Sequence, residues 1–139
     1  MHLVCPAGSL PALKAALQQG ADAIYVGFRD DTNARHFAGL NLDERQLETG
    51  LQLIRQRGRQ LYVAVNTYAQ PQGWARWQRA VDQAAALGVD ALIAADPGVL
   101  AYASRRHPDL NLHLSVQGSA TNYEAINFYR EQFGVVRAV

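Results

Sequence analysis

The chain contains the sequence QGADAIYVG at residues 19–27 and a close copy of it, LGVDALIAAD, at residues 87–96. An alanine-rich amphipathic stretch precedes each copy. Glycine is favoured just after the end of a helix, because it readily adopts the left-handed backbone conformation needed there. The short apolar run that follows is typical of a buried parallel strand. Each copy therefore predicts a helix, a glycine turn and a strand, and a fainter third copy, FGVVRAV, occupies residues 133–139.

The same alternation of helix and strand signals runs along the rest of the chain. Helix starts are predicted by capping signals, and these are Ser9 with Pro11, Asp43 with Gln46, Asp96 with Pro97, and Thr121 with Glu124. A further helix is predicted by an apolar stripe at Trp74, Trp77, Val81 and Ala84. Six strands are predicted between the helices, at residues 2–5, 23–26, 61–65, 91–94 and 112–116 and in the final residues.

Strands that alternate with helices predict parallel, right-handed βα units, which occur in (β/α)₈ barrels and in doubly wound open sheets. A doubly wound nucleotide-binding domain normally carries three glycines after its first strand. The corresponding sequence here, CPAGS at residues 5–9, has one. We therefore predict an α/β fold of the parallel TIM-barrel type, incomplete, with about six strands present. Residues 1–139 are expected to be the amino-terminal portion of a single barrel domain, with the remainder of the barrel absent.

Composition indicates a globular protein with no strong charge. Of the 139 residues, 49% are hydrophobic and 18% are charged, and the formal net charge is +1. A surface that binds nucleic acid is therefore not expected. Arg55, Arg57 and Arg59 cluster, but they lie where a predicted helix ends, and cations there complement the helix dipole.

Cys5 is the only cysteine, so the chain predicts neither a disulfide framework nor a metal site built from several cysteines. His36, His107 and His113 have no partners at metal-ligand spacing, so no metal site is predicted within these residues. The sequence shows neither a signal peptide nor an apolar stretch of transmembrane length. A cytoplasmic location is expected.

The polar connection at residues 28–42 is the strongest functional candidate. It is longer than the two to six residues usual for such turns, and long loops of this kind are often binding elements. Within it, Arg35 can make paired hydrogen bonds to a carboxylate or a phosphate. The alternative is that Arg35 pairs with Asp30 or Asp31 and merely orders the loop.

Other candidate substrate-binding residues follow from topology, because the carboxyl ends of the strands form the working face in both architectures. Asn66 and Gln117 can hold a polar substrate through their amides, or can satisfy buried backbone at the mouth of the barrel. Ser115 lies at the same face. Asp96 fits a helix cap better than an acid or base, because Pro97 follows it. No catalytic residue is identified by the pattern.

Several stretches resemble the collagenase-like peptidase family, number thirty-two of the peptidases of unassigned mechanism. They are residues 5–8 and 20–27, the sequence NARHF at 33–37 and the sequence LSVQ at 114–117. Three further stretches, at residues 30–41, 75–82 and 120–129, resemble the UbiU-like branch of this family, which acts in ubiquinone biosynthesis. The similarity covers essentially the whole chain.

This resemblance implies oxygen-independent hydroxylation of the ubiquinone ring, carried out as a heterodimer with a paralogous UbiV-like subunit. It implies a quinone precursor as the small-molecule substrate, prephenate as the candidate oxygen source and a [4Fe–4S] cluster on four cysteines of the full-length protein. Those cysteines lie beyond residue 139 in the relatives and Cys5 matches none of them, so no cofactor is expected within this segment. The segment alone is expected to be inactive, with Arg35, Asn66 and Gln117 helping to hold an anionic or polar small substrate.

Two other functions remain open. The family name suggests a peptidase. A non-catalytic alternative is a partner-binding subunit whose active centre lies elsewhere.

Overall fold

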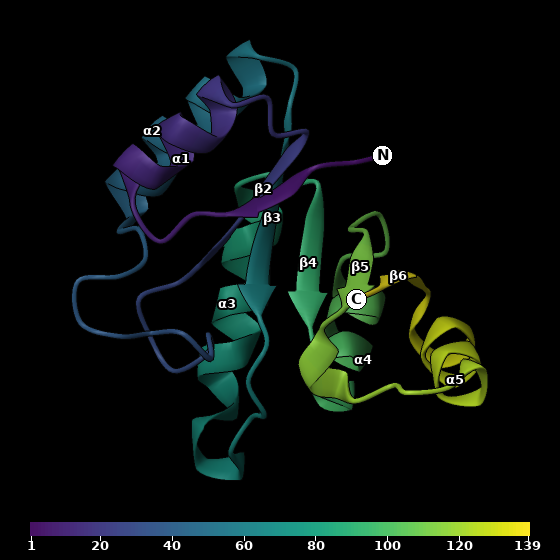
Figure 1. The fold of residues 1–139 in the computed structure, drawn as a ribbon. Helices are drawn as coiled ribbons and strands as arrows, with labels where there is room; N and C mark the ends of the chain where they lie inside the picture. Colours follow the sequence, from purple (N-terminus) through teal and green to yellow (C-terminus); the bar gives the residue numbers. More distant parts are fainter.

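The computed structural model describes residues 1–139 as one curved, parallel sheet of six strands covered by helices (Figure 1). The strands are β1 (Val4–Pro6), β2 (Ala23–Gly27), β3 (Gln60–Val65), β4 (Ala91–Ala94), β5 (Leu112–Leu114) and β6 (Val135–Ala138). Each strand pairs in parallel with the next one along the chain, so the order in the sheet is the order in the sequence. A doubly wound sheet would reverse its order at a switch point. The prediction of an incomplete barrel is confirmed, since β1 and β6 are the two free edges of an open sheet.

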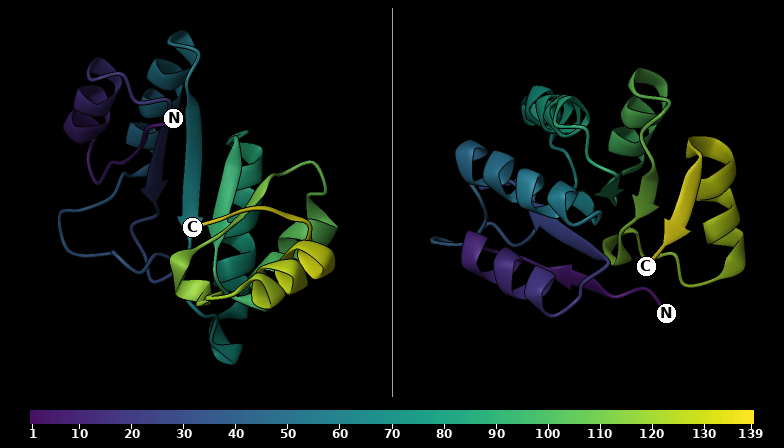
Figure 2. Two further views of the ribbon diagram at one scale, coloured as in Figure 1. Left: turned by 45° about the vertical axis from the view of Figure 1, so that its right-hand side comes forward. Right: turned by 90° about the horizontal axis from the view of Figure 1, so that it is seen from above.

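Five helices cover one face of this sheet and leave the other face free, as the view from above in Figure 2 shows. They are α1 (Leu10–Gln18), α2 (Glu44–Gln56), α3 (Trp74–Ala86), α4 (Pro97–Arg106) and α5 (Tyr123–Phe133). Two short 3₁₀ helices, η1 (Pro71–Gly73) and η2 (Val116–Gly118), lie in the connections that follow β3 and β5. Each helix connects two neighbouring parallel strands, which is the arrangement of a right-handed βα unit.

The core lies between the helices and the convex face of the sheet, and the side-chain alternation of the strands builds it. On β3, Leu61, Val63 and Val65 are fully buried in this core. Tyr62 points to the opposite face, where it joins a smaller cluster with Ala23 and Ala91. The sheet therefore has a densely packed convex face and a concave face lined by small and aromatic side chains.

The repeated sequence has the predicted form. Gly20 and Gly88 follow α1 and α3 with positive φ angles of 86° and 66°, and Gly134 follows α5 with a φ of 71°. The aspartates of the first two copies have a role that the pattern does not reveal. Asp22 accepts a hydrogen bond from the backbone N–H of Leu3 at 2.9 Å, and Asp90 accepts one from Leu61 at 2.8 Å.

Three of the four predicted helix caps are confirmed. Ser9 accepts a hydrogen bond from Ala12, Asp43 and Gln46 form a reciprocal capping box, and Asp96 accepts from the first turn of α4. The fourth prediction is wrong, because α5 is capped by Asn122, whose side chain accepts a hydrogen bond from Ala125 at 3.0 Å. Thr121 therefore lies one residue too early to act as the cap.

The predicted fifth strand is also too long. The strand β5 ends at Leu114, and Val116 begins the 3₁₀ helix η2 instead of continuing the sheet. Ser115 causes this change of direction, because its hydroxyl accepts a hydrogen bond from the backbone N–H of Gln117 at 3.3 Å. The side chain of Ser115 thus caps a turn at the working end of the sheet.

Candidate functional site

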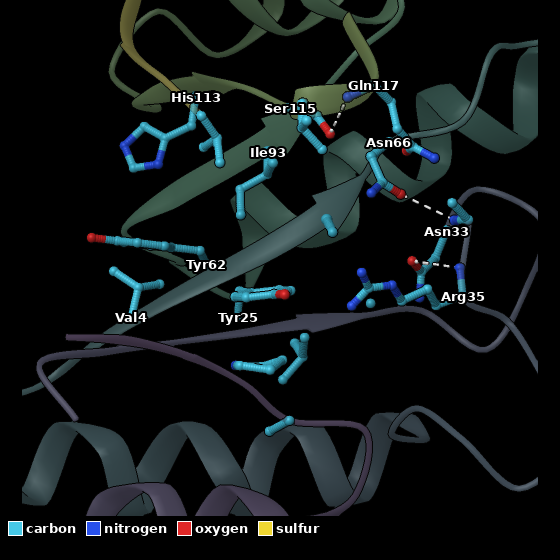
Figure 3. A pocket seen from close by; sticks show the side chains of 18 of the residues that line it. Val4, Tyr25, Asn33, Arg35, Tyr62, Asn66, Ile93, His113, Ser115 and Gln117 are labelled. Atoms are coloured by element: carbon cyan, nitrogen blue, oxygen red, sulfur yellow. Dashed lines mark hydrogen bonds between the residues drawn. The ribbon is translucent and has the colours of Figure 1, made fainter. Parts of the chain in front are cut away.

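A cavity of about 660 Å³ lies on the concave face of the sheet and extends to residues that follow the carboxyl ends of the strands. Such a volume is typical of sites for small molecules. Figure 3 shows its lining side chains, which come from β1 to β6, from residues 33–41 and from η2. Arg35 and Arg137 are the charged side chains that line it, and no Asp or Glu is among the lining residues. The cavity is therefore suited to a ligand that carries negative charge.

The connection between β2 and α2 forms one wall of the cavity and is ordered by its own side chains. Thr32 and Asn33 are buried, at 0% and 5% exposure. Asp30 accepts hydrogen bonds from both the backbone N–H and the hydroxyl of Thr32. The Arg29 guanidinium donates to the backbone carbonyl of Asn41 at 2.8 Å and so joins the two ends of the loop.

Three asparagine side chains hold the backbone around Arg35, and we call Asn33, Asn41 and Asn66 the asparagine clamp. Asn33 Oδ1 accepts from the Arg35 N–H at 3.2 Å, and Asn41 Nδ2 donates to the Arg35 carbonyl at 2.9 Å. Asn66 Oδ1 accepts from the Ala34 N–H at 3.0 Å. Asn33 and Asn41 also bond to each other at 3.2 Å. The backbone at Arg35 is therefore fixed from both the loop and the end of β3.

Gly27, the last residue of β2, leaves the space that the clamp needs. A Cβ atom built at this position would overlap the side-chain amide of Asn33. Gly27 ends the first copy of the repeated sequence, so this glycine serves close packing and not a turn. Asn41 adopts a positive φ of 73°, a conformation that asparagine tolerates better than most residues.

The Arg35 guanidinium lines the cavity and belongs to none of the four ion pairs of the chain. The aspartates expected as alternative partners are engaged elsewhere. Asp30 bonds Thr32, and Asp31 pairs with Arg76 of α3. The structure therefore leaves the donors of Arg35 available to a ligand.

Four of the five predicted site residues line this cavity, namely Arg35, Asn66, Ser115 and Gln117. Asp96 does not line it. One oxygen of Asp96 accepts from Gly98 at 2.6 Å and Val99 at 3.1 Å, and the other accepts from Ala69 at 3.1 Å, so the carboxylate caps α4. Two arginines of the cluster at the end of α2 have structural contacts, since Arg55 bonds the carbonyls of Leu87 and Gly88 and Arg59 pairs with Asp22.

Sequence reasoning missed the inner wall of the cavity, which Val4, Tyr25, Tyr62, Ile93 and His113 line. They share the concave face because strand side chains alternate. That alternation is visible in LYVAV at 61–65, where Tyr62 and Ala64 alternate with branched aliphatic residues. It could have identified this face once the convex core was assigned.

His113 is the titratable group most altered by this environment. It is 6% exposed and packs edge-on against Tyr62, with the ring centroids 4.8 Å apart and the ring planes at 77°. Burial, and to a smaller extent the positive charge of Arg137, lowers the pKa of His113 to about 4. Its imidazole is therefore neutral at physiological pH.

Residues 1–139 do not fit a metal centre. No group of three or more His, Cys, Asp or Glu side chains is placed to share an ion. Cys5 is half-buried on β1 and contacts the core. A [4Fe–4S] cluster held by four cysteines would need ligands from other residues.

Sequence comparison finds relatives that are about three times as long as this chain. A family model described as peptidase family U32 matches residues 8–139. Over 99% of this chain, tRNA hydroxylation protein P of Escherichia coli is 29% identical, and tRNA hydroxylation protein P1 of Bacillus subtilis is 30% identical. A collagenase of Porphyromonas gingivalis is 31% identical over 97% of this chain. The chain spans 30% to 32% of the length of these three relatives.

Solved structures agree with the fold. The U32 peptidase Mk0906 superposes with a TM-score of 0.76 at 16% identity, covering 96% of this chain and 56% of that one. A thiamine phosphate pyrophosphorylase from Pyrococcus furiosus superposes with a TM-score of 0.64 at 18% identity, covering 99% of this chain and 58% of that one. At such identities the likeness concerns the fold alone. No helix has the length and apolar character needed to cross a membrane.

Proposed function

This chain belongs to peptidase family U32, and on that premise we propose that it forms the amino-terminal part of a subunit for oxygen-independent hydroxylation of the ubiquinone ring. The concave cavity is the observation that carries the proposal. It combines a free guanidinium at Arg35 with apolar and aromatic walls, and no carboxylate side chain lines it. A site of this kind favours a small molecule with an apolar body and an anionic group.

In this proposal Arg35 binds the anionic group of the small substrate. Its guanidinium carries five N–H donors in a fixed planar geometry, which matches a carboxylate. Asn66 uses its oxygen to hold the backbone of the loop, so its amide N–H groups are the part left for a ligand. Gln117 is exposed at the rim, where its side-chain amide can contact a polar group. Prephenate, as the oxygen source, has the anionic chemistry that Arg35 fits.

The complete protein is proposed to carry a [4Fe–4S] cluster on cysteines outside residues 1–139, and to work with a paralogous UbiV-like subunit. Two relatives from Bacillus subtilis are named tRNA hydroxylation proteins P1 and P2, so paralogous members of this family occur in one organism. The segment described here would supply part of the barrel and the Arg35 wall of the substrate cavity.

Hydroxylation of tRNA is the second candidate, because several relatives at about 30% identity carry that name. The near-neutral charge of this segment favours the quinone. Nucleic-acid binding generally depends on many Lys and Arg contacts to phosphate. The third candidate is peptide hydrolysis, which the name of the collagenase relative suggests.

Deletion of the encoding gene separates the three candidates. Under oxygen-free growth, mass spectrometry of the lipid extract should show loss of the hydroxylated quinone and accumulation of its less hydroxylated precursor. Hydroxylated nucleosides in digested tRNA should be unchanged. Loss of a hydroxylated nucleoside with a normal quinone profile would overturn the proposal in favour of tRNA. Normal quinone and tRNA profiles, with lost cleavage of a collagen peptide, would favour the peptidase.

A further inference from the structure

The inner end of the cavity contains a histidine that the proposed function does not use. His113 lies on β5, is 6% exposed and lines the cavity. Neither ring nitrogen is hydrogen-bonded within the chain, and neither is among the fully buried polar atoms, so the ring nitrogens reach the cavity. Polar side chains with little exposure usually have a hydrogen-bond partner. An unpaired imidazole facing a cavity is therefore a position where a ligand can supply the missing partner.

The neighbours of His113 determine what kind of partner fits. Tyr62 of β3 packs against its ring, and the Arg137 guanidinium of β6 lies 6.0 Å from the centroid of the Tyr62 ring. The hydroxyl of Tyr62 donates to Gln60 at 2.8 Å. The neutral imidazole offers one N–H donor and one nitrogen acceptor. Such a group suits an uncharged hydroxyl or carbonyl oxygen.

The walls between this histidine and the rim are apolar and aromatic. Val4, Tyr25 and Ile93 line this part of the cavity. In the view of Figure 3, Arg35 and His113 lie on opposite sides, with the ring of Tyr25 between them and the ring of Tyr62 below His113. A ligand complementary to these walls therefore has an anionic group at the Arg35 end, an apolar body, and a hydroxyl or carbonyl oxygen at the His113 end, where the Arg137 guanidinium is directed to the hydroxyl of Tyr62 at 3.5 Å.

We propose that His113 forms a second subsite of this cavity, where its imidazole hydrogen-bonds a hydroxyl or carbonyl oxygen on the apolar body of a ligand whose anionic group binds Arg35. The inference rests on the proposed small-molecule role of the cavity. In this role His113 discriminates between ligands with and without that oxygen. Acids that carry the inner oxygen bind more tightly than acids of the same shape that lack it.

Calorimetric titration of the complete protein with two pairs of acids tests this subsite. One pair is para-hydroxyphenylpropanoate and phenylpropanoate, and the shorter pair is para-hydroxyphenylacetate and phenylacetate. In each pair the two acids differ only in the hydroxyl group. The proteins compared are the wild type, His113→Phe, Arg35→Gln and the control Arg79→Gln, which removes an exposed arginine from α3, outside the cavity lining.

The wild type should prefer the hydroxylated acid in at least one pair. His113→Phe keeps the packing against Tyr62 and should lower the affinity for the hydroxylated acid about tenfold, which corresponds to about 1.4 kcal/mol of binding free energy. It should leave the affinity for the matching acid without the hydroxyl nearly unchanged. Arg35→Gln should lower the affinity for both acids, and Arg79→Gln should lower the affinity for neither.

Equal weakening of both acids by His113→Phe, no preference in the wild type, or no binding of any acid would overturn the proposal. If His113→Phe lowers the affinity for the hydroxylated acid only and Arg35→Gln changes neither affinity, the subsite at His113 is supported and the binding role of Arg35 is contradicted. Nitrogen NMR of the wild type covers the case in which His113→Phe does not fold. The ring resonances of His113 should shift with the hydroxylated acid only, and equal shifts with both acids would contradict the subsite.

Discussion

The backbone and the side chain of Arg35 have different environments, and this difference makes the residue suitable for binding. The asparagine clamp holds the backbone through hydrogen bonds of 2.9 to 3.2 Å. The guanidinium has no ion pair within the chain. Binding to a side chain on a loop whose backbone is already ordered costs less conformational entropy than binding that must first order the loop.

Gly27→Ala tests how much the clamp matters. The new methyl group would overlap the Asn33 amide, so Asn33 must move and its bonds to Arg35 and Asn41 are disturbed. We expect the free energy of unfolding to fall by about 1–3 kcal/mol, as overpacking generally causes. Binding of an anionic acid to the complete protein should weaken about tenfold, because Arg35 loses its fixed position. Urea unfolding and calorimetry measure the two effects, and unchanged affinity in a folded variant would show that the clamp does not position Arg35.

His113 gives the protein a pH dependence with a definite sign. Its pKa in the folded chain is about 4, below the ordinary value of 6.5, because burial disfavours the charged ring. The unfolded chain therefore binds more protons than the folded chain between these two pH values, so stability falls as the pH drops from about 6.5 to about 4. Tyr62 and Arg137 are the titratable and charged side chains that contact or act on this ring.

Comparison of the wild type with His113→Phe isolates this effect. The wild type should lose on the order of 1–3 kcal/mol of its free energy of unfolding between pH 7 and pH 4.5 in excess of the loss in the variant. Urea unfolding at the two pH values gives both differences. If the two proteins lose the same free energy, the folded-state pKa of His113 is close to its ordinary value and the ring is not desolvated as described.

At the level of elements, the repeated unit contains a connection between neighbouring strands. Asp22 follows α1 and accepts from Leu3, just before β1, while Asp90 follows α3 and accepts from Leu61 in β3. The backbone hydrogen bond from Leu3, with the charge of Arg59, holds the pKa of Asp22 below its usual value. Each aspartate thus ties the start of its own strand to the start of the preceding strand.

Asp90→Ala should therefore lower the free energy of unfolding by about 1–2 kcal/mol, because the N–H of Leu61 loses a charged acceptor. The matched control is Asp109→Ala in the turn before β5, where the side chain is exposed and makes no hydrogen bond or ion pair with the chain. That control should change stability by less than about 0.5 kcal/mol. Urea unfolding compares them, and equal stabilities of the two variants would show that the aspartate of the repeat has no structural role.

The elements were largely predictable because their signals are local. The glycines of the repeat and the caps at Ser9, Asp43 and Asp96 depend on residues within one turn of each other. The errors at Val116 and Thr121 arose where a neighbouring polar side chain, Ser115 or Asn122, competed for the same backbone N–H groups. The positions of Arg35 and Asn66 near the carboxyl ends of the strands could be predicted from the topology. The hydrogen bond between Asn66 and Ala34 spans thirty-two residues, and local patterns carry no information about it.

At the scale of the whole molecule, the open sheet places all polar candidates except Asp96 on one concave face. The convex face is fully used by the core under the helices. The chain spans about a third of the length of its first relatives. We therefore propose that residues 1–139 supply a substrate-binding wall and that the ligands of a [4Fe–4S] cluster lie in other residues.

Steady-state kinetics of the proposed quinone hydroxylation, measured with the complete protein and the proposed UbiV-like subunit, tests whether the concave cavity binds the substrate. The comparison is between Arg35→Gln, which removes a cavity-lining arginine that has no ion pair, and Arg79→Gln, which removes an exposed arginine outside the cavity. Loss of charged hydrogen bonds to a bound anion corresponds to about a tenfold to hundredfold loss of kcat/KM, and Arg79→Gln should retain the wild-type value. Wild-type kcat/KM in a folded Arg35→Gln protein would contradict the assignment of this cavity as the substrate site.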